Sequence, residues 1–122
     1  KEFPNINIIK SNYIITNLEE INSNERYLAF AGIGNFDNFV DLLKVNNINL
    51  VNTIHYPDHY KYNDTDFKKI KEIAKTNKAK IITTEKDFFR IDENNRNEIN
   101  VVKIKLKINN NDEFINFLKK KL

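Results

Sequence analysis

Three apolar runs, each followed by a polar turn and then by apolar residues at helical spacing, constrain the fold of this chain more than any other feature. The first run, Tyr27–Ala31, is apolar at every position, which is typical of a strand covered by helices on both faces. It ends at Gly32–Asn35, and Asn35 is the predicted cap of the helix that follows. The apolar residues of that helix are Phe36, Phe39, Val40 and Leu43.

The second unit has the same order. Leu50–His55 is predicted to be a strand, and the loop Pro57–Tyr62 leads into a second helix. Asn63 or Thr65 is the predicted cap of this helix. Its apolar residues are Phe67, Ile70, Ile73 and Ala74.

The third unit is shorter. Ile81–Thr83 is predicted to be a buried strand that runs into a brief helix ending at Phe88 and Phe89. Thr84 and Asp87 have the spacing of a capping box, and we interpret both as capping residues of this helix. His55, which ends the strand of the second unit, is expected to pack at the edge of the core.

The two ends of the chain differ from these units. Within Val102–Ile108, apolar residues alternate with lysines, which predicts one edge strand with a face in water. A last helix is expected over 114–122, with its lysines at the C-terminal end. Near the start, Ile6–Ile9 and Tyr13–Thr16 flank a polar triplet and are interpreted as a two-stranded, hairpin-like connector.

Strands that alternate with helices predict an α/β fold with a mostly parallel sheet. We expect a three-layer, Rossmann-like domain over residues 26–122, preceded by the two-stranded connector over 1–25. In such a sheet the carboxyl ends of the strands meet at one edge, so the three loops should converge there. Helix N-termini at that edge suit a phosphate or a carboxylate.

Composition limits the possible functions. With 122 residues the chain is long enough for one domain, and the absence of cysteine excludes disulfides and cysteine chemistry. A balance of 20 basic and 17 acidic residues is too even to indicate nucleic acid as a partner. No apolar run reaches the length of a membrane span, so the chain is expected to be soluble. Its first residue, Lys1 rather than Met, suggests a fragment of a longer protein.

Three segments in register resemble the C-terminal signatures of the tetraacyldisaccharide 4'-kinases of lipid A biosynthesis. The segments are Ala29–Asn35, Pro57–Tyr62 and Thr83–Asp87, and the similarity extends over about Tyr27 to Arg90. Phe36 departs from the family pattern, which commonly has proline after the asparagine. This change removes no reactive group.

The resemblance implies a kinase that phosphorylates the 4'-hydroxyl of a tetraacyldisaccharide 1-phosphate at the cytoplasmic side of the bacterial inner membrane. It implies ATP and Mg²⁺ as cofactors and the lipid A precursor as substrate. The two glycines, Gly32 and Gly34, cannot build a P-loop. We therefore expect a missing N-terminal P-loop domain to bind ATP, and this chain alone to bind no cofactor and to be inactive. Contact with the membrane would occur through the complete enzyme.

Five residues are the predicted site. His59 is the predicted catalytic residue, because imidazole titrates near neutral pH and can accept or relay a hydroxyl proton. The resemblance implies that it works with an aspartate of the N-terminal domain. Asp58 is expected to orient His59. Asn35, Lys86 and Glu85 are expected to contact substrate or phosphate, and no residue is assigned as a metal ligand.

Two other functions remain open at this stage. One is a metal-dependent phosphoesterase or nuclease that uses Asp58, Glu85 and Asp87 at the strand ends. The other is a non-catalytic module that binds phosphate or, through its lysines, nucleic acid.

Overall fold

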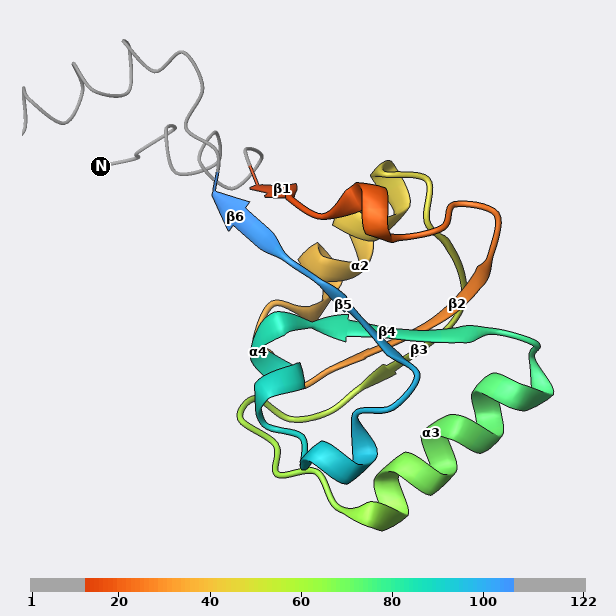
Figure 1. Cartoon of the computed structure of the whole chain (residues 1–122). Helices are drawn as coiled ribbons and strands as arrows, with labels where there is room; N and C mark the ends of the chain where they lie inside the picture. Colours follow the sequence, from red (N-terminus) through yellow and green to blue (C-terminus); the bar gives the residue numbers. More distant parts are fainter. Residues whose placement is uncertain (1–12, 107–122) are drawn as a thin grey trace, which may run out of the picture.

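The centre of the molecule is a four-stranded parallel sheet, seen in a computed structural model that describes residues 13–106 (Figure 1). The strand order is β3-β2-β4-β5. The middle of the sheet consists of β2 (Arg26–Ala31) and β4 (Lys80–Thr84), and its edges are β3 (Asn49–His55) and β5 (Ile99–Val102). The predicted α/β class, the parallel sheet and the central position of the first apolar run are confirmed.

Helices cover both faces of the sheet, as the predicted three-layer architecture requires (Figure 1). Helix α2 (Phe36–Val45) joins β2 to β3, and α3 (Asp64–Thr76) joins β3 to β4 on the other face. Alternation along β2 explains the two layers, because successive strand residues point to opposite faces. Tyr27, Ala29 and Ala31 lie in the core cluster with α2, whereas Leu28 and Phe30 lie in the cluster with α3.

The helix caps are partly as predicted. Asn63 and Asp66 form a complete capping box at the start of α3, with both hydrogen bonds at 2.9 Å. Thr84 caps the short helix α4 (Glu85–Phe89) by accepting from the Asp87 amide. Asn35 occupies the N-cap position of α2, but its side chain makes no capping hydrogen bond. Its ψ of 53° lies outside the extended region that the other two caps adopt, so this part of the prediction is wrong.

The run from Val102 does not form one continuous strand, which corrects the sequence prediction. It divides at Lys103 into β5, which is paired with β4, and β6 (Ile104–Leu106), which pairs antiparallel with β1 (Tyr13–Ile15). The cause is Asn17, a buried side chain that no sequence pattern indicated. Its amide group donates to the Val101 carbonyl at 2.7 Å and accepts from the Lys103 amide at 2.9 Å, so the backbone at Lys103 turns from one sheet to the other.

The remaining elements are two single turns of 3-10 helix, η1 (Leu18–Glu20) and η2 (Glu93–Asn95). The edge position predicted for the C-terminal strand is confirmed for β5. The predicted strand over 6–9 and the predicted helix over 114–122 lie outside the described residues. Between residues 13 and 106, no helix has the length and apolar character needed to cross a bilayer.

Candidate functional site

The three predicted loops follow the carboxyl ends of β2, β3 and β4 and therefore lie along one edge of the sheet. The connections after β2 and β4 leave toward opposite faces: α2, which follows β2, packs in one core cluster, whereas Phe88 and Ile91, which follow β4, pack in the other. Such a switch between neighbouring strands is where open α/β sheets bind ligands. The predicted site residues therefore lie in the part of the fold where such sheets bind ligands.

Asp87 joins the three loops. Its side chain is fully buried, and its carboxylate accepts from the Gly32 amide at 2.9 Å and from the Tyr62 hydroxyl at 2.8 Å. It also accepts from the Thr84 hydroxyl and pairs with the Arg90 guanidinium at 2.9 Å. These partners come from all three loops, so one carboxylate holds the whole edge together.

This arrangement corrects the interpretation of Asp87 as a capping residue. Thr84 does cap α4, but the Asp87 side chain does not return to the backbone of the cap. Its charge is balanced by Arg90, which also donates to the Gly32 carbonyl at 3.1 Å. The one sequence signal for this role was the spacing of Asp87 and Arg90, three residues apart in a helical turn.

Gly32 is required by the close approach of the second loop rather than by a left-handed backbone. Neither glycine has a positive φ. A β-carbon added at Gly32 would lie 2.8 Å from the Pro57 carbonyl oxygen and 3.2 Å from the β-carbon of Tyr60. The absence of a side chain at Gly32 thus allows the second loop to pack directly against the first.

His59 stands on that second loop with its imidazole in solvent. Its backbone has φ 62°, in the left-handed region, and its amide donates to the Gly32 carbonyl at 3.2 Å. The side chain is 80% exposed and lies 3.7 Å from the Asp58 carboxylate, a distance for charge attraction rather than a hydrogen bond. His59 neither caps α3 nor packs under the neighbouring tyrosines, so its imidazole is available to react.

A cluster of aromatic rings fixes the rest of the second loop. Tyr60 stacks on Tyr56, with ring centroids 4.7 Å apart, and its hydroxyl donates to Asp66 at 3.1 Å. Tyr62 meets Phe30 edge to face at 5.4 Å. Burial raises the pKa of Tyr56 to about 12. Burial, and then the charge of Asp87, raises the pKa of Tyr62, so its hydroxyl keeps the proton that it donates to Asp87.

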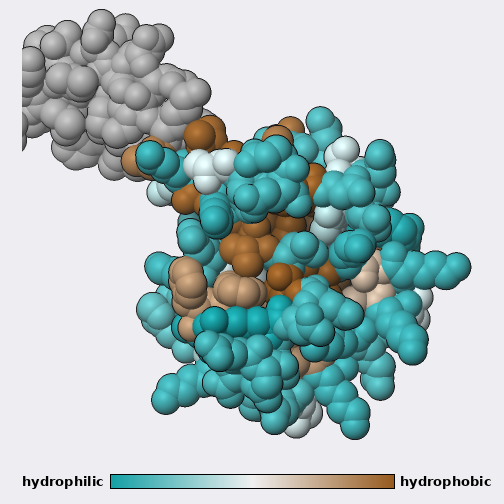
Figure 2. All heavy atoms as spheres, in the orientation of Figure 1, coloured by the Kyte–Doolittle hydropathy of each residue, from teal (hydrophilic) through white to brown (hydrophobic). Residues whose placement is uncertain are grey.

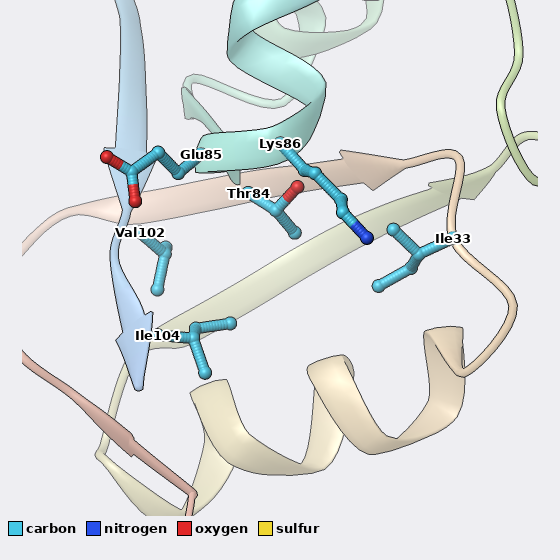
Figure 3. A pocket seen from close by; sticks show the side chains of 6 residues that line it. All are labelled: Ile33, Thr84, Glu85, Lys86, Val102 and Ile104. Atoms are coloured by element: carbon cyan, nitrogen blue, oxygen red, sulfur yellow. The ribbon is translucent and has the colours of Figure 1, made fainter. Parts of the chain in front are cut away.

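Glu85 and Lys86 line an open pocket of about 270 Å³ beside the first and third loops (Figure 3). Its other lining residues are Ile33, Thr84, Val102 and Ile104. The Lys86 side chain extends toward Ile33, whereas the Glu85 carboxylate lies on the side of Val102 (Figure 3). Figure 2 shows hydrophobic side chains gathered in the middle of this face. The pocket therefore has an apolar wall and a charged rim.

Asn35 lines a second hollow, of about 180 Å³, together with His55 and residues at the start of α2. The His55 ring stacks on Phe36, with centroids 4.5 Å apart and planes 6° from parallel. Its Nε2 atom lies 3.3 Å from the Ile33 carbonyl oxygen. His55 thus packs against the core edge as expected, although the residue remains exposed to solvent.

The predicted residues do not form a metal site within residues 13–106, where no group of three histidine or carboxylate side chains has the geometry to hold an ion. Asp87, one of the three carboxylates of the phosphoesterase hypothesis, is buried and already bonded to protein groups. Asp58 lies beside His59 on a different loop from Glu85. The geometry does not favour the metal-dependent alternative.

The sequence of the chain is similar to those of one family of known proteins. A family described as Tetraacyldisaccharide-1-P 4'-kinase matches residues 5–122. Among curated proteins, a tetraacyldisaccharide 4'-kinase of Pelagibacter ubique is 45% identical over 115 residues, which is 94% of this chain and 37% of the relative. A Rickettsia bellii protein of the same name is 41% identical over 75% of the chain and 28% of the relative. The chain spans about a third of the length of these relatives. No solved structure matches.

Proposed function

The chain belongs to the tetraacyldisaccharide-1-P 4'-kinase family, and we propose that the protein containing it transfers the γ-phosphoryl group of ATP to the 4'-hydroxyl of a tetraacylated disaccharide 1-phosphate. The observation that carries the proposal is His59. Its imidazole projects from a firmly held loop into solvent, at the sheet edge where α/β proteins bind ligands.

This chain contributes one side of the proposed active site. Phosphoryl transfer needs a nucleotide cradle, Mg²⁺ and a group that orients or deprotonates the attacking hydroxyl. The two glycines of the chain cannot form a P-loop, so ATP and Mg²⁺ are bound mainly by a P-loop domain elsewhere in the complete protein. The 122-residue chain alone is inactive.

His59 is the proposed general base or proton relay for the sugar hydroxyl. Its side chain is 80% exposed, and among residues 13–106 its one charged neighbour is Asp58. Asp58, 3.7 Å away, is the proposed partner that orients the His59 ring. An aspartate of the P-loop domain would complete the relay from the other side of the crevice.

Lys86, Glu85 and Asn35 are the proposed substrate contacts. Lys86 is exposed at the rim of the apolar-walled pocket, where an ammonium can meet a phosphate oxygen. Glu85 is half-buried beside it and can accept from a sugar hydroxyl. The Asn35 side chain is not used for capping and can hydrogen-bond a substrate at the start of α2.

We further propose that the reaction takes place at the cytoplasmic face of the bacterial inner membrane, where the acylated substrate would reside. The complete protein would contact the membrane surface outside the residues described in the structure. Nucleic acid is not a proposed partner, because the charge balance of the chain is nearly even.

The test is an assay of the complete protein with ATP, Mg²⁺ and tetraacyldisaccharide 1-phosphate in detergent micelles. We expect a bisphosphorylated product by mass spectrometry, with phosphorus-proton coupling at the 4' position in NMR spectra. The 122-residue chain, assayed in parallel, should form none. Magnesium-dependent hydrolysis of a phosphodiester, with no phosphate added to the disaccharide, would instead establish the phosphoesterase alternative.

A further inference from the structure

The backbone of His59 is linked to the buried Asp87 carboxylate through a single glycine. The His59 amide donates to the Gly32 carbonyl at 3.2 Å, and the Gly32 amide donates to Asp87 at 2.9 Å. Arg90 donates to the same two acceptors, the Gly32 carbonyl at 3.1 Å and Asp87 at 2.9 Å. Both polar groups of Gly32 are therefore held by the ion pair.

A second link joins Asp87 to the other end of the His59 loop. The Tyr62 hydroxyl donates to Asp87 at 2.8 Å, so the carboxylate is bonded to the residue three positions after His59. The loop between these two attachments has little freedom, because the His59 backbone is in the left-handed region and Pro57 lies directly against Gly32. The backbone that carries the exposed imidazole is thus held in place by a buried carboxylate.

We propose that Asp87 is a positioning residue for the transfer reaction: through Gly32 and Tyr62 it holds the His59 loop in its reactive position. The inference rests on the proposed function, since it requires His59 to act on the substrate. Asp87 contacts neither substrate nor nucleotide. It acts by keeping the imidazole within hydrogen-bond reach of the hydroxyl, where a displacement of about 1 Å can cost up to about 100-fold in rate.

The leading test variant is Tyr62→Phe in the complete kinase. It removes one hydroxyl from the network and leaves the ring against Phe30 and the Asp87–Arg90 pair in place. We expect kcat to fall about tenfold while the KM for ATP stays unchanged, because ATP binds elsewhere. Asp87→Asn, which also weakens the bond to Arg90, should lower kcat further, and circular dichroism establishes that the variant is folded.

A matched control is Tyr60→Phe. It removes a hydroxyl of the same loop that donates to Asp66 on α3 rather than to Asp87. We expect kcat within about twofold of the wild type. A loss equal to that of Tyr62→Phe would attribute the effect to general loosening of the loop and would overturn the inference.

The decisive measurement is a double-mutant cycle with His59→Asn, because asparagine tolerates the left-handed backbone. If Asp87 acts through the imidazole, Tyr62→Phe should change kcat less than about twofold in the His59→Asn protein. Equal factors in both backgrounds would contradict the positioning role. If His59→Asn alone keeps the wild-type kcat, the proposed catalytic role of His59 is wrong. This outcome can be distinguished from equal factors in the two backgrounds, which would contradict only the positioning role of Asp87.

Discussion

At the scale of single residues, the site depends on one residue that lacks a side chain. Gly32 lies beneath the His59 loop, and its hydrogen bonds link that loop to Asp87. Its φ is not positive, so alanine there would not strain the backbone of the residue itself. The cost of a side chain comes from the Pro57 carbonyl oxygen, 2.8 Å from the position of the added β-carbon.

We predict that Gly32→Ala destabilises the domain by about 1–3 kcal/mol, because the second loop must move away from the sheet edge. Gly34→Ala is the matched control. Its β-carbon would have the Asp58 carboxylate as its nearest neighbour, at an ordinary 3.7 Å. It should be neutral or stabilise by up to about 1 kcal/mol. Urea unfolding of both variants measures the difference, and equal midpoints would disprove the close-approach explanation.

Residue type and local spacing predict candidate residues on the surface of the site, but they do not reveal the role of the residues beneath it. His59 was singled out because its chemistry is evident from its residue type. Asp87 was assigned to capping because its neighbour Thr84 explained it locally. The partners that define its role, Gly32 and Tyr62, are 55 and 25 residues away in the chain. No local spacing could indicate those hydrogen bonds.

At the scale of secondary-structure elements, two asparagines at helix starts give a test of capping. Asn63 bonds the Asp66 amide, whereas Asn35 makes no capping hydrogen bond. We predict that Asn63→Ala costs about 1 kcal/mol of unfolding free energy. Asn35→Ala should change it by less than about 0.5 kcal/mol. Similar losses in the two variants, measured by urea unfolding, would show that the capping assignment is wrong.

Asn17 determines where β5 ends and β6 begins. We predict that Asn17→Ala costs about 1–3 kcal/mol, because the Val101 carbonyl and the Lys103 amide both lose a partner. Asn22→Ala removes an exposed, local bond to the Asn24 amide and should cost less than about 0.5 kcal/mol. Thermal unfolding compares the two variants, and an equally small loss in Asn17→Ala would contradict the role of Asn17 in separating β5 from β6.

The three strand-helix units could be predicted because the spacing of apolar residues within each unit indicates its strand and its helix. The division of the run from Val102 into two strands could not be predicted in this way. Apolar residues and lysines alternate without interruption through Lys103 and Lys105, so the pattern alone predicts a single strand. The break results from a side chain more than 80 residues earlier in the chain.

At the scale of the whole molecule, the tyrosine cluster makes the free energy of unfolding decrease at high pH. The pKa of Tyr56 is raised to about 12, chiefly by burial, from the ordinary value of about 10. A raised pKa means that the folded state retains the proton longer than the unfolded state. The contribution is therefore constant below about pH 10 and is lost as pH rises toward 12.

We predict that unfolding free energy, measured with urea at pH 8 and pH 11, falls more in the wild type than in Tyr56→Phe. The variant removes a titrating hydroxyl but keeps a ring that can stack on Tyr60. The comparison between proteins cancels the titration of the lysines. An equal fall in both would mean that Tyr56 does not titrate differently in the folded state.

The most direct test of the proposed role of His59 is chemical rescue of His59→Gly in the complete protein. Glycine accepts the left-handed backbone, and the exposed position leaves room for a small molecule. We predict that kcat falls about 100-fold or more and that added imidazole restores part of it. A kcat equal to that of the wild type without imidazole would contradict the account, because the imidazole of His59 would then take no part in the transfer.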